Sequence, residues 1–350
     1  MGSDGDGFRP IQALGELVPY QWSAGLVMRG MAELGFADHL ARGPLGAAEL
    51  AALIGAHAPS LHRFLRVCVL HELVTAGPDG TFALTRRGSL LRTEVPSLAG
   101  FTVAVNGPGM TRPWERVADV VRTGRPASEL VLGRSHWDWY ADHPAEARAY
   151  AETSAALSAE AATALVRTID LGGARRVVDV GGSPGTVLAE VLRAAPWAAG
   201  VLFDLPWAIP YAAAALAAPL EEGRAELVAG DFREAVPAGG DVHLLKNILC
   251  DLPDEDAGQV LRACAAASAP AGRLVVVDWE DSACPSHVHA NDVEFMVLTG
   301  GRARTGDEYE ALLGRAGWVT VRRTRLAGFE QAPVVVLEGR RVIDSTEGPS

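Results

Sequence analysis

Apolar residues in the first half of the chain recur at steps of three and four positions, up to about residue 169. This spacing places the apolar side chains on one stripe of a helix. Between residues 20 and 40 the apolar side chains with this spacing include Leu26, Met28, Met31, Leu34 and Phe36. We therefore expect residues 11–169 to form a mainly α-helical domain, preceded by a disordered segment at 1–10.

Residues 45–85 show a more particular order of elements. Two apolar helical stretches, LGAAELAALIG and LHRFLRVCVLHELV, are separated by Ala-Pro-Ser and followed by a Gly-Pro-Asp-Gly turn and TFALT. A helix pair followed by a β-ribbon is typical of a winged helix. Such a motif can read DNA through its second helix, so a regulator is one interpretation. That helix carries Arg63 and Arg66 but is otherwise largely apolar, which favours burial against a second subunit.

After Gly172 the pattern changes to short apolar runs that alternate with helical stretches. Alternating strands and helices predict a parallel, doubly wound sheet of the α/β class. A short loop joins the last two runs, so they should form an antiparallel pair at the edge. The expected strands are residues 175–181, 200–204, 225–230, 241–248, 273–279, 318–326 and 333–340.

Composition excludes several classes of binding partner for the protein. The 350 residues suffice for two domains, and the formal net charge of −12 opposes binding to nucleic acid or to an anionic membrane surface. The four cysteines lie far apart, so we expect neither a metal site nor a disulfide framework. Without an apolar run of membrane-spanning length or a secretory leader pattern, the chain is expected to be cytoplasmic and to act on a small molecule.

The strongest local signal is the loop Gly181-Gly182-Ser183-Pro184-Gly185, which follows the first strand of the second half and precedes a helix. Glycines there let the backbone approach a ligand, and the helix presents free amide groups. The next strand ends at Asp204, and 204 − 185 gives a separation of 19 residues. A carboxylate at this spacing can accept hydrogen bonds from ribose hydroxyls, as in dinucleotide-binding folds. NAD remains a rival ligand on spacing alone.

With these residues the chain resembles class I S-adenosylmethionine (SAM) dependent O-methyltransferases of the plant caffeate O-methyltransferase type. The resemblance is to the actinomycete branch that tailors secondary metabolites, including anthracycline-type methyltransferases and their non-methylating relatives. It rests on DVGGSPG (179–185), FDLP (203–206), GDF (230–232), LLKNILCDLPDEDA (244–257), LTGGRART (298–305) and the segment 124–144. It implies an N-terminal winged-helix dimerisation domain at 11–169, a Rossmann-like SAM-binding domain at 170–342, a disordered tail at 343–350, and a homodimer.

The resemblance also implies the cofactor site, with SAM as methyl donor and S-adenosylhomocysteine (SAH) as product. Asp204 would bind the ribose and Lys246 would contact the cofactor end of the site. The remaining cofactor residues implied are Asp179, Gly181 and Gly182 for the methionine part, Asp231 and Phe232 for adenine, and Ser183, Gly185, Leu205 and Gly230 in the same loops.

The catalytic positions depart from the family pattern. The family has His-Asp where this chain has Cys250-Asp251, and it has an acidic residue where this chain has Ala303; the second acidic position falls on Asp278. Cys250 could act as a base only as a thiolate, and a thiol in an apolar pocket keeps its proton unless a cation lies nearby. A small pocket wall is the alternative role. The other candidates for catalysis are Asp251, His287 and His289.

By the same resemblance, an acceptor pocket is expected beside the cofactor. Aromatic and thioether side chains there suit a flat aromatic or polycyclic acceptor. The expected lining residues are His136, Trp137, Tyr140 and Tyr150 on one side and Cys250, Asp251, Asn291, Met296 and Thr299 on the other.

Three functions remain open from the sequence. The first is methyl transfer, with oxygen as the favoured acceptor atom. The acceptor would then be an acidic phenol or enol that ionises readily, or another residue would serve as the base. The second is non-methylating chemistry such as hydroxylation, decarboxylation or cyclisation, in which the sulfonium is a fixed positive charge. The third is a regulatory or binding protein with a relict site, which the full set of cofactor contacts argues against.

Overall fold

The computed structural model describes residues 21–93, 98–281 and 287–342. The segments expected to be disordered, 1–10 and 343–350, lie outside the described residues. Contacts between Cα atoms divide the chain into two compact units, Met1–Gly107 and Pro108–Ser350. None of the described helices is both long and apolar enough to cross a membrane.

The first unit contains the expected winged helix. Its three short strands form an antiparallel sheet in the order β1-β3-β2, and α4 and α5 precede the β2–β3 ribbon. The helical stretch expected between residues 20 and 40 is broken at Gly35, which has φ 65°. The elements are α2 (Gln21–Leu34), α3 (Phe36–Leu40), β1 (Leu45–Gly46), α4 (Ala47–Ile54), α5 (Ala58–Leu70), β2 (Val74–Ala76), β3 (Thr81–Leu84), η1 (Gly88–Leu91) and α6 (Ala99–Val105).

The second unit is built on a seven-stranded sheet with the order β6-β5-β4-β7-β8-β10-β9. The first five of these strands run parallel, whereas β10 is antiparallel to both β8 and β9. The mixed α/β fold and the antiparallel final pair are therefore confirmed. The strands are β4 (Arg176–Val180), β5 (Ala199–Asp204), β6 (Ala225–Ala229), β7 (Gly240–Lys246), β8 (Ser268–Trp279), β9 (Trp318–Arg325) and β10 (Val334–Arg341).

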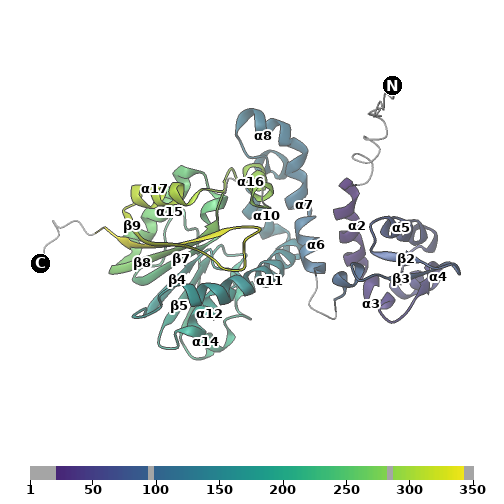
Figure 1. Ribbon diagram of the computed structural model, residues 1–350, viewed down its shortest axis with the longest axis horizontal. Coiled ribbons are helices and arrows are strands. Elements are labelled where there is room, and N and C mark those ends of the chain that lie inside the picture. Colours follow the sequence, from purple (N-terminus) through teal and green to yellow (C-terminus); the bar gives the residue numbers. More distant parts are fainter. Residues whose placement is uncertain (1–20, 94–97, 282–286, 343–350) are drawn as a thin grey trace, which may run out of the picture. The chain divides into compact units, whose positions relative to one another are not determined.

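Helices cover both faces of this sheet (Figure 1). Neighbouring residues of a strand point to opposite faces, so Val177 packs in the apolar core beneath α12 and Val178 in the core beneath α15 and α17. The helices are α7 (Pro108–Thr111), η2 (Arg112–Arg116), α8 (Val117–Thr123), α9 (Ser128–Leu132), α10 (His136–Asp142), α11 (Pro144–Thr168), α12 (Thr186–Ala194), α13 (Ile209–Ala212), α14 (Ala217–Glu221), η3 (Leu249–Asp251), α15 (Asp254–Ala267), α16 (His287–Leu298) and α17 (Gly306–Arg315).

The division between the units differs from the expected boundary at residue 169. The long helix α11 groups with the sheet, because Ala161, Ala162 and Leu165 belong to the same buried core as the α12 side of the sheet. Helical periodicity extends across residue 108 without a change, so the apolar pattern alone carries no signal of this division.

Candidate active site

The glycine-rich loop leaves β4 and turns into α12. Gly181 has φ 69° and Gly185, which precedes the first helical residue, has φ 88°, a region that side chains with a Cβ rarely adopt. At Gly182 a Cβ would lie 2.4 Å from Cγ of Asp179. The loop therefore needs glycine at these positions to pass close to the end of β4.

Asp204 closes the loop from the end of β5. Its carboxylate accepts hydrogen bonds from the backbone amides of Ser183, at 2.9 Å, and Leu205, at 2.7 Å. Burial raises the pKa of Asp204, and the two amide bonds act in the opposite direction. Each bond uses one lone pair, so this oriented carboxylate keeps acceptor capacity for a ligand.

Asp179 is buried, with 1% of its surface exposed, and its Oδ2 atom has no hydrogen-bond partner among the described residues. Burial and then the charge of Asp204 raise the pKa of Asp179 to about 7, while Lys246 lowers it. A buried carboxylate oxygen without a donor fits a ligand that brings one, such as an ammonium group.

A cavity joins this loop to aromatic side chains of α10 and α11. The space open to the centre of a water molecule is about 130 Å³, which is several times what one water needs. Of the expected residues it is lined by Trp137, Tyr150, Asp179, Gly181, Gly182, Ser183, Asp204, Leu205, Phe232, Lys246 and Asp251.

Three expected cofactor residues lie outside this lining. Gly185 turns the chain into α12, and a Cβ on Gly230 would lie 2.5 Å from the ring of Phe203, so both act through the backbone. Asp231 forms an ion pair with Arg233, at 2.7 Å, and lines a second cavity.

Sequence reasoning missed several residues of the first cavity. Asn247 follows β7 with φ 54°, which is uncommon for a residue other than glycine, and Trp207 follows the Asp204 loop. An Asn after a buried strand carries no distinct sequence signal. The further unexpected lining residues are Ala151, Ser154, Ser158, Pro184, Thr186, Val187, Ala208, Ile248 and Leu252.

The second cavity adjoins the first and measures about 190 Å³ on the same basis. Trp137, Leu205, Phe232, Asp251 and Leu252 line both cavities. The expected acceptor residue Thr299 lines the second cavity. The shared lining shows that the two spaces are neighbours, separated or joined only by these five residues.

An aromatic cluster backs the first cavity. The rings of Tyr140 and Tyr150 are stacked with centroids 5.3 Å apart, and Trp137 meets Tyr150 edge-on at 5.6 Å. His136 lies buried against Tyr140, and burial lowers its pKa to about 4, so its imidazole is neutral at pH 7. His136 and Tyr140 therefore support the wall from behind rather than line either cavity.

Cys250 lies in η3 beneath the cavity, with 1% of its surface exposed. Its backbone amide donates to Oδ2 of Asp278, which is fully buried, at 3.1 Å. Burial, and then the charges of Asp278 and Asp251, raise the pKa of the Cys250 thiol well above its ordinary value. The thiol therefore keeps its proton at neutral pH, which argues against a thiolate base. Cys250 also lies outside the lining of both cavities, so the expected pocket-wall role is not seen either.

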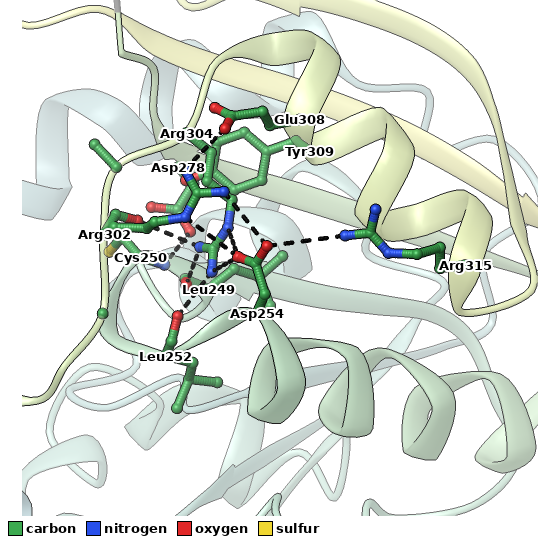
Figure 2. A network of polar contacts seen from close by, with 12 residues as sticks. Leu249, Cys250, Leu252, Asp254, Asp278, Arg302, Arg304, Glu308, Tyr309 and Arg315 are labelled. Carbon is green, nitrogen blue, oxygen red and sulfur yellow. Dashed lines mark hydrogen bonds and ion pairs between the residues drawn. The ribbon is translucent and has the colours of Figure 1, made fainter. Parts of the chain in front are cut away.

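Arg304 holds the η3 loop in place (Figure 2). Its buried guanidinium donates to the carbonyl oxygens of Leu249, at 2.5 Å, and Leu252, at 2.8 Å, and forms an ion pair with Asp254 at 2.8 Å. Gly301 brings its backbone against the same loop, because a Cβ there would lie 2.1 Å from the Cys250 carbonyl oxygen. The GGRART segment thus positions residues 249–252.

The remaining catalytic and acceptor candidates lie on or near α16. His287 and His289 are exposed in its first turn, and His289 lies 3.2 Å from Asp281, so neither lines either cavity. Asn291 and Met296 are partly buried but also lie outside both linings. Because α16 buries Val288, Val297 and Leu298, its histidines are turned to the surface.

Comparison with known proteins identifies the family. A family model of the O-methyltransferase domain matches residues 114–319, and one of the O-methyltransferase dimerisation domain matches residues 23–94. The chain belongs to the SAM-dependent O-methyltransferase family. It is thus an enzyme, a methyltransferase, with a dimerisation domain at its N-terminal side.

Individual relatives agree with this assignment. The chain is 34% identical over 293 residues to phenazine O-methyltransferase PhzM of Lysobacter antibioticus, covering 83% of this chain and 86% of that protein. The structure of the mitomycin 7-O-methyltransferase MmcR matches with a TM-score of 0.87 at 30% identity, covering 95% and 98% of the two chains. NcsB1 from neocarzinostatin biosynthesis, solved with SAM and 2-hydroxy-5-methyl naphthoic acid, matches with a TM-score of 0.81 at 28% identity, covering 93% and 98%. Both O- and N-methyltransferases occur among the relatives.

Proposed function

We propose that this methyltransferase transfers a methyl group from SAM to a hydroxyl oxygen of a small aromatic or polycyclic secondary metabolite. One observation carries the proposal: a single cavity joins the glycine-rich loop and Asp204 to the aromatic side chains of Trp137 and Tyr150. A flat acceptor against those rings would lie beside the cofactor. The phenazine, mitomycin and naphthoic acid names among the relatives support an acceptor of this class.

The cofactor residues follow from the chemistry of the cavity. Asp179 presents a buried oxygen that lacks a donor, which fits the ammonium group of the methionine part. Asp204, oriented by two amides, suits the ribose hydroxyls, and Phe232 offers an aromatic face for adenine. When bound, SAM supplies an electrophilic methyl group on a sulfonium. Burial lowers the pKa of Lys246, and the charges of Asp278 and Asp179 partly offset this effect, so the Lys246 ammonium balances the negative charge of these carboxylates.

The protonated thiol of Cys250 cannot accept the hydroxyl proton of the acceptor. A positioned base is worth about 10²–10⁴-fold, so an enzyme without one depends on an acceptor that ionises readily. We therefore propose an acidic phenol or enol as the acceptor, with the buried Cys250 outside the cavity lining and the two cavities fixing the line of attack.

We also propose a homodimer formed through the first unit. The dimerisation-domain match supports it, as do the exposed leucines of that unit, including Leu26 on α2, which is 47% exposed.

The test begins with calorimetric titration of the full chain with SAM and with SAH. Binding of both in the micromolar range is expected, and failure of both to bind would overturn the proposal.

Transfer of labelled methyl from SAM is then followed across hydroxynaphthalenes and hydroxyphenazines of graded hydroxyl acidity. Labelled ether products, formed faster from the more acidic hydroxyls, are expected. Turnover of an acceptor without labelled product would instead favour the non-methylating alternative that the missing His-acid pair suggests.

A further inference from the structure

The turn η3 carries residues that both cavities share. Asp251 lies in this turn and Leu252 directly after it, and each lines the first and the second cavity. The backbone hydrogen bonds that Asp251 and Leu252 donate within the turn are long, at 3.2 Å and 3.3 Å. Bonds of this length lie at or beyond the upper end of the usual range. The position of these lining residues therefore depends on groups that hold the turn from outside.

The guanidinium of Arg304 holds both ends of the turn. Its Nη1 donates to the carbonyl oxygen of Leu249, at 2.5 Å, and its Nη2 donates to that of Leu252, at 2.8 Å (Figure 2). A guanidinium is planar and presents its N–H groups in a rigid fork. One rigid group therefore sets the distance between the two ends, and Asp251 lies between them.

Arg304 is itself fixed to the rest of the unit. Its Nε and Nη2 atoms donate to Oδ1 of Asp254 in the first turn of α15, at 2.9 Å and 2.8 Å. Its backbone forms a bridge with Glu280, which follows β8, and its carbonyl oxygen accepts from the Asp281 amide at 2.9 Å. The Arg304 side chain is buried. Arg304 therefore fixes the turn relative to the sheet and to α15.

Two further contacts hold the same turn. The Cys250 amide donates to Oδ2 of the buried Asp278 at 3.1 Å. Gly301 packs directly on the turn, because a Cβ there would lie 2.5 Å from the carbonyl carbon of Asp251. Arg304, Asp278 and Gly301 all lie outside the linings of both cavities. They can therefore act on a ligand in those cavities only through the turn.

The buried charge of Arg304 calls for an explanation other than stability. Replacing a whole buried ion pair by apolar residues of similar volume is often neutral or stabilising, because burial removes the hydration of both charges. Apolar residues cannot supply directed donors to two carbonyl oxygens. Methyl transfer needs close alignment of the acceptor, and a misplacement of about 1 Å can cost about 10²-fold in rate. A fixed position of the turn is thus worth more to the reaction than to the fold.

We propose that Arg304 is a positioning residue for methyl transfer, which orients the acceptor by fixing Asp251 and Leu252 at the edge of the two cavities. The inference rests on the proposed function and adds the residue that sets the orientation of the acceptor. The cofactor loop is held separately, by the bonds of Asp204 to the amides of Ser183 and Leu205. Loss of the Arg304 bonds should therefore disturb the acceptor and leave cofactor binding largely intact.

The test measures which hydroxyl of an acceptor is methylated. The probes are 1,3-dihydroxynaphthalene and 1,6-dihydroxynaphthalene, each with two inequivalent hydroxyls. The full chain is supplied with labelled SAM, and the two monoethers of each probe are separated by chromatography. Their ratio does not depend on how much of the enzyme is folded, so a purely structural role of Arg304 would not change it. The wild type should favour one monoether of at least one probe by about tenfold. A wild type without preference would overturn the proposal.

Two substitutions remove the fork in different ways. Arg304→Gln should shift the monoether ratio by at least about threefold and lower kcat/KM for the acceptor by about tenfold or more. The Kd of SAH should change by less than about twofold. Arg304→Lys keeps the positive charge, but its single ammonium lacks the rigid fork, so the ratio should shift in the same direction. If Arg304→Gln does not fold, Arg304→Lys decides the outcome.

Arg315→Gln is the matched control. This arginine reaches the same Asp254 carboxylate at 3.9 Å, but it is exposed and bonds to neither carbonyl oxygen of the turn. The substitution removes one positive charge, as Arg304→Gln does, and should leave the monoether ratio unchanged. A shift as large as that of Arg304→Gln would show that the charge near Asp254, and not the fork, sets the ratio.

The same measurements separate this inference from the proposed function. If the wild type does not bind SAH, or forms no labelled ether from either probe, the proposed acceptor class fails and this inference with it. If labelled ethers form and their ratio is the same in the wild type and in the folded Arg304 variants, this inference fails alone, even where the rate falls. Loss of SAH binding in those variants would assign the effect to the cofactor and would also refute it.

Discussion

At residue 250 the chain has a buried thiol where the family resemblance leads us to expect an imidazole, and the surroundings of this thiol decide what it can do. Asp278 and Asp251 add negative charge to an already desolvated sulfur, so the thiol holds its proton. The distinction between a buried packing residue and a base can be measured, because a base contributes far more to the rate of methyl transfer.

We expect Cys250→Ser to change the rate of labelled methyl transfer by no more than about threefold, since a hydroxyl of similar size fills the same space. The measurement is the initial rate at saturating SAM with an active hydroxynaphthalene. Asp204→Asn serves as the contrasting variant and should weaken SAM binding. A loss of about a hundredfold in Cys250→Ser would identify the thiolate as the base after all.

Asp179 links the stability of the ligand-free enzyme to pH. Its pKa is about 7 in the folded protein against an ordinary 3.8, so the folded state binds the proton more tightly than the unfolded state does. The stabilisation of the folded state by this proton on Asp179 is fully present below about pH 3.8 and is lost as pH rises through about 7. We expect Asp179→Asn to reduce the fall in Tm between about pH 5 and pH 8, measured by thermal denaturation. The exposed Glu221→Gln should leave that fall unchanged, and an equal fall in Asp179→Asn would refute the link.

At the scale of elements, η3 is a single turn that depends on neighbours for its shape. From a fully buried position, Arg304 donates to the carbonyl oxygens of Leu249 in this turn and Leu252 directly after it. Arg302 instead pairs at the surface with Asp254 and Glu308. Losing a buried hydrogen-bond donor lowers the free energy of unfolding strongly, because its acceptors stay desolvated and unpaired. An exposed ion pair contributes little to that free energy.

We therefore expect Arg304→Gln to lower the free energy of unfolding by about 2–4 kcal/mol and Arg302→Gln by less than about 1 kcal/mol. Urea denaturation followed by fluorescence measures both. Equal destabilisation by the two variants would contradict the role assigned to Arg304.

The sequence predicted the strands well, because short β-branched runs such as Val177-Val178 are bounded by glycine and polar residues. It predicted less where neighbouring elements decide the outcome. The first helical stretch breaks at Gly35, and β8 begins at Ser268 rather than at residue 273.

At the scale of the whole molecule, the cofactor side of the site was more predictable than the acceptor side. A glycine loop and an acid nineteen residues later lie on adjacent parallel strands, so sequence spacing alone brings them together. Acceptor residues come from helices far apart in the chain, and their rotation cannot be obtained from periodicity. Tyr150 lines the cavity whereas Asn291 and Met296 do not, although all three were expected there.

We expect the full chain to sediment at twice its monomer mass. Changing Leu26 and Leu34 together to Asp should shift it toward the monomer, because both leucines are exposed on α2 of the first unit. Trp197→Asp, at an exposed apolar position of the second unit, is the matched control and should leave the dimer intact. A wild-type monomer at micromolar concentration would refute the dimer.

The strand β10 has a consequence for how the protein is made. It is the last described strand in the chain, yet it lies between β8 and β9 inside the sheet. During translation β8 therefore presents an open edge, and β9 has no neighbour, until residues 334–341 emerge from the ribosome. Open edges invite pairing with other chains. Until these residues emerge, the catalytic unit should therefore be prone to pairing with other chains. Chaperones or slow release would then decide how much nascent chain reaches the native state.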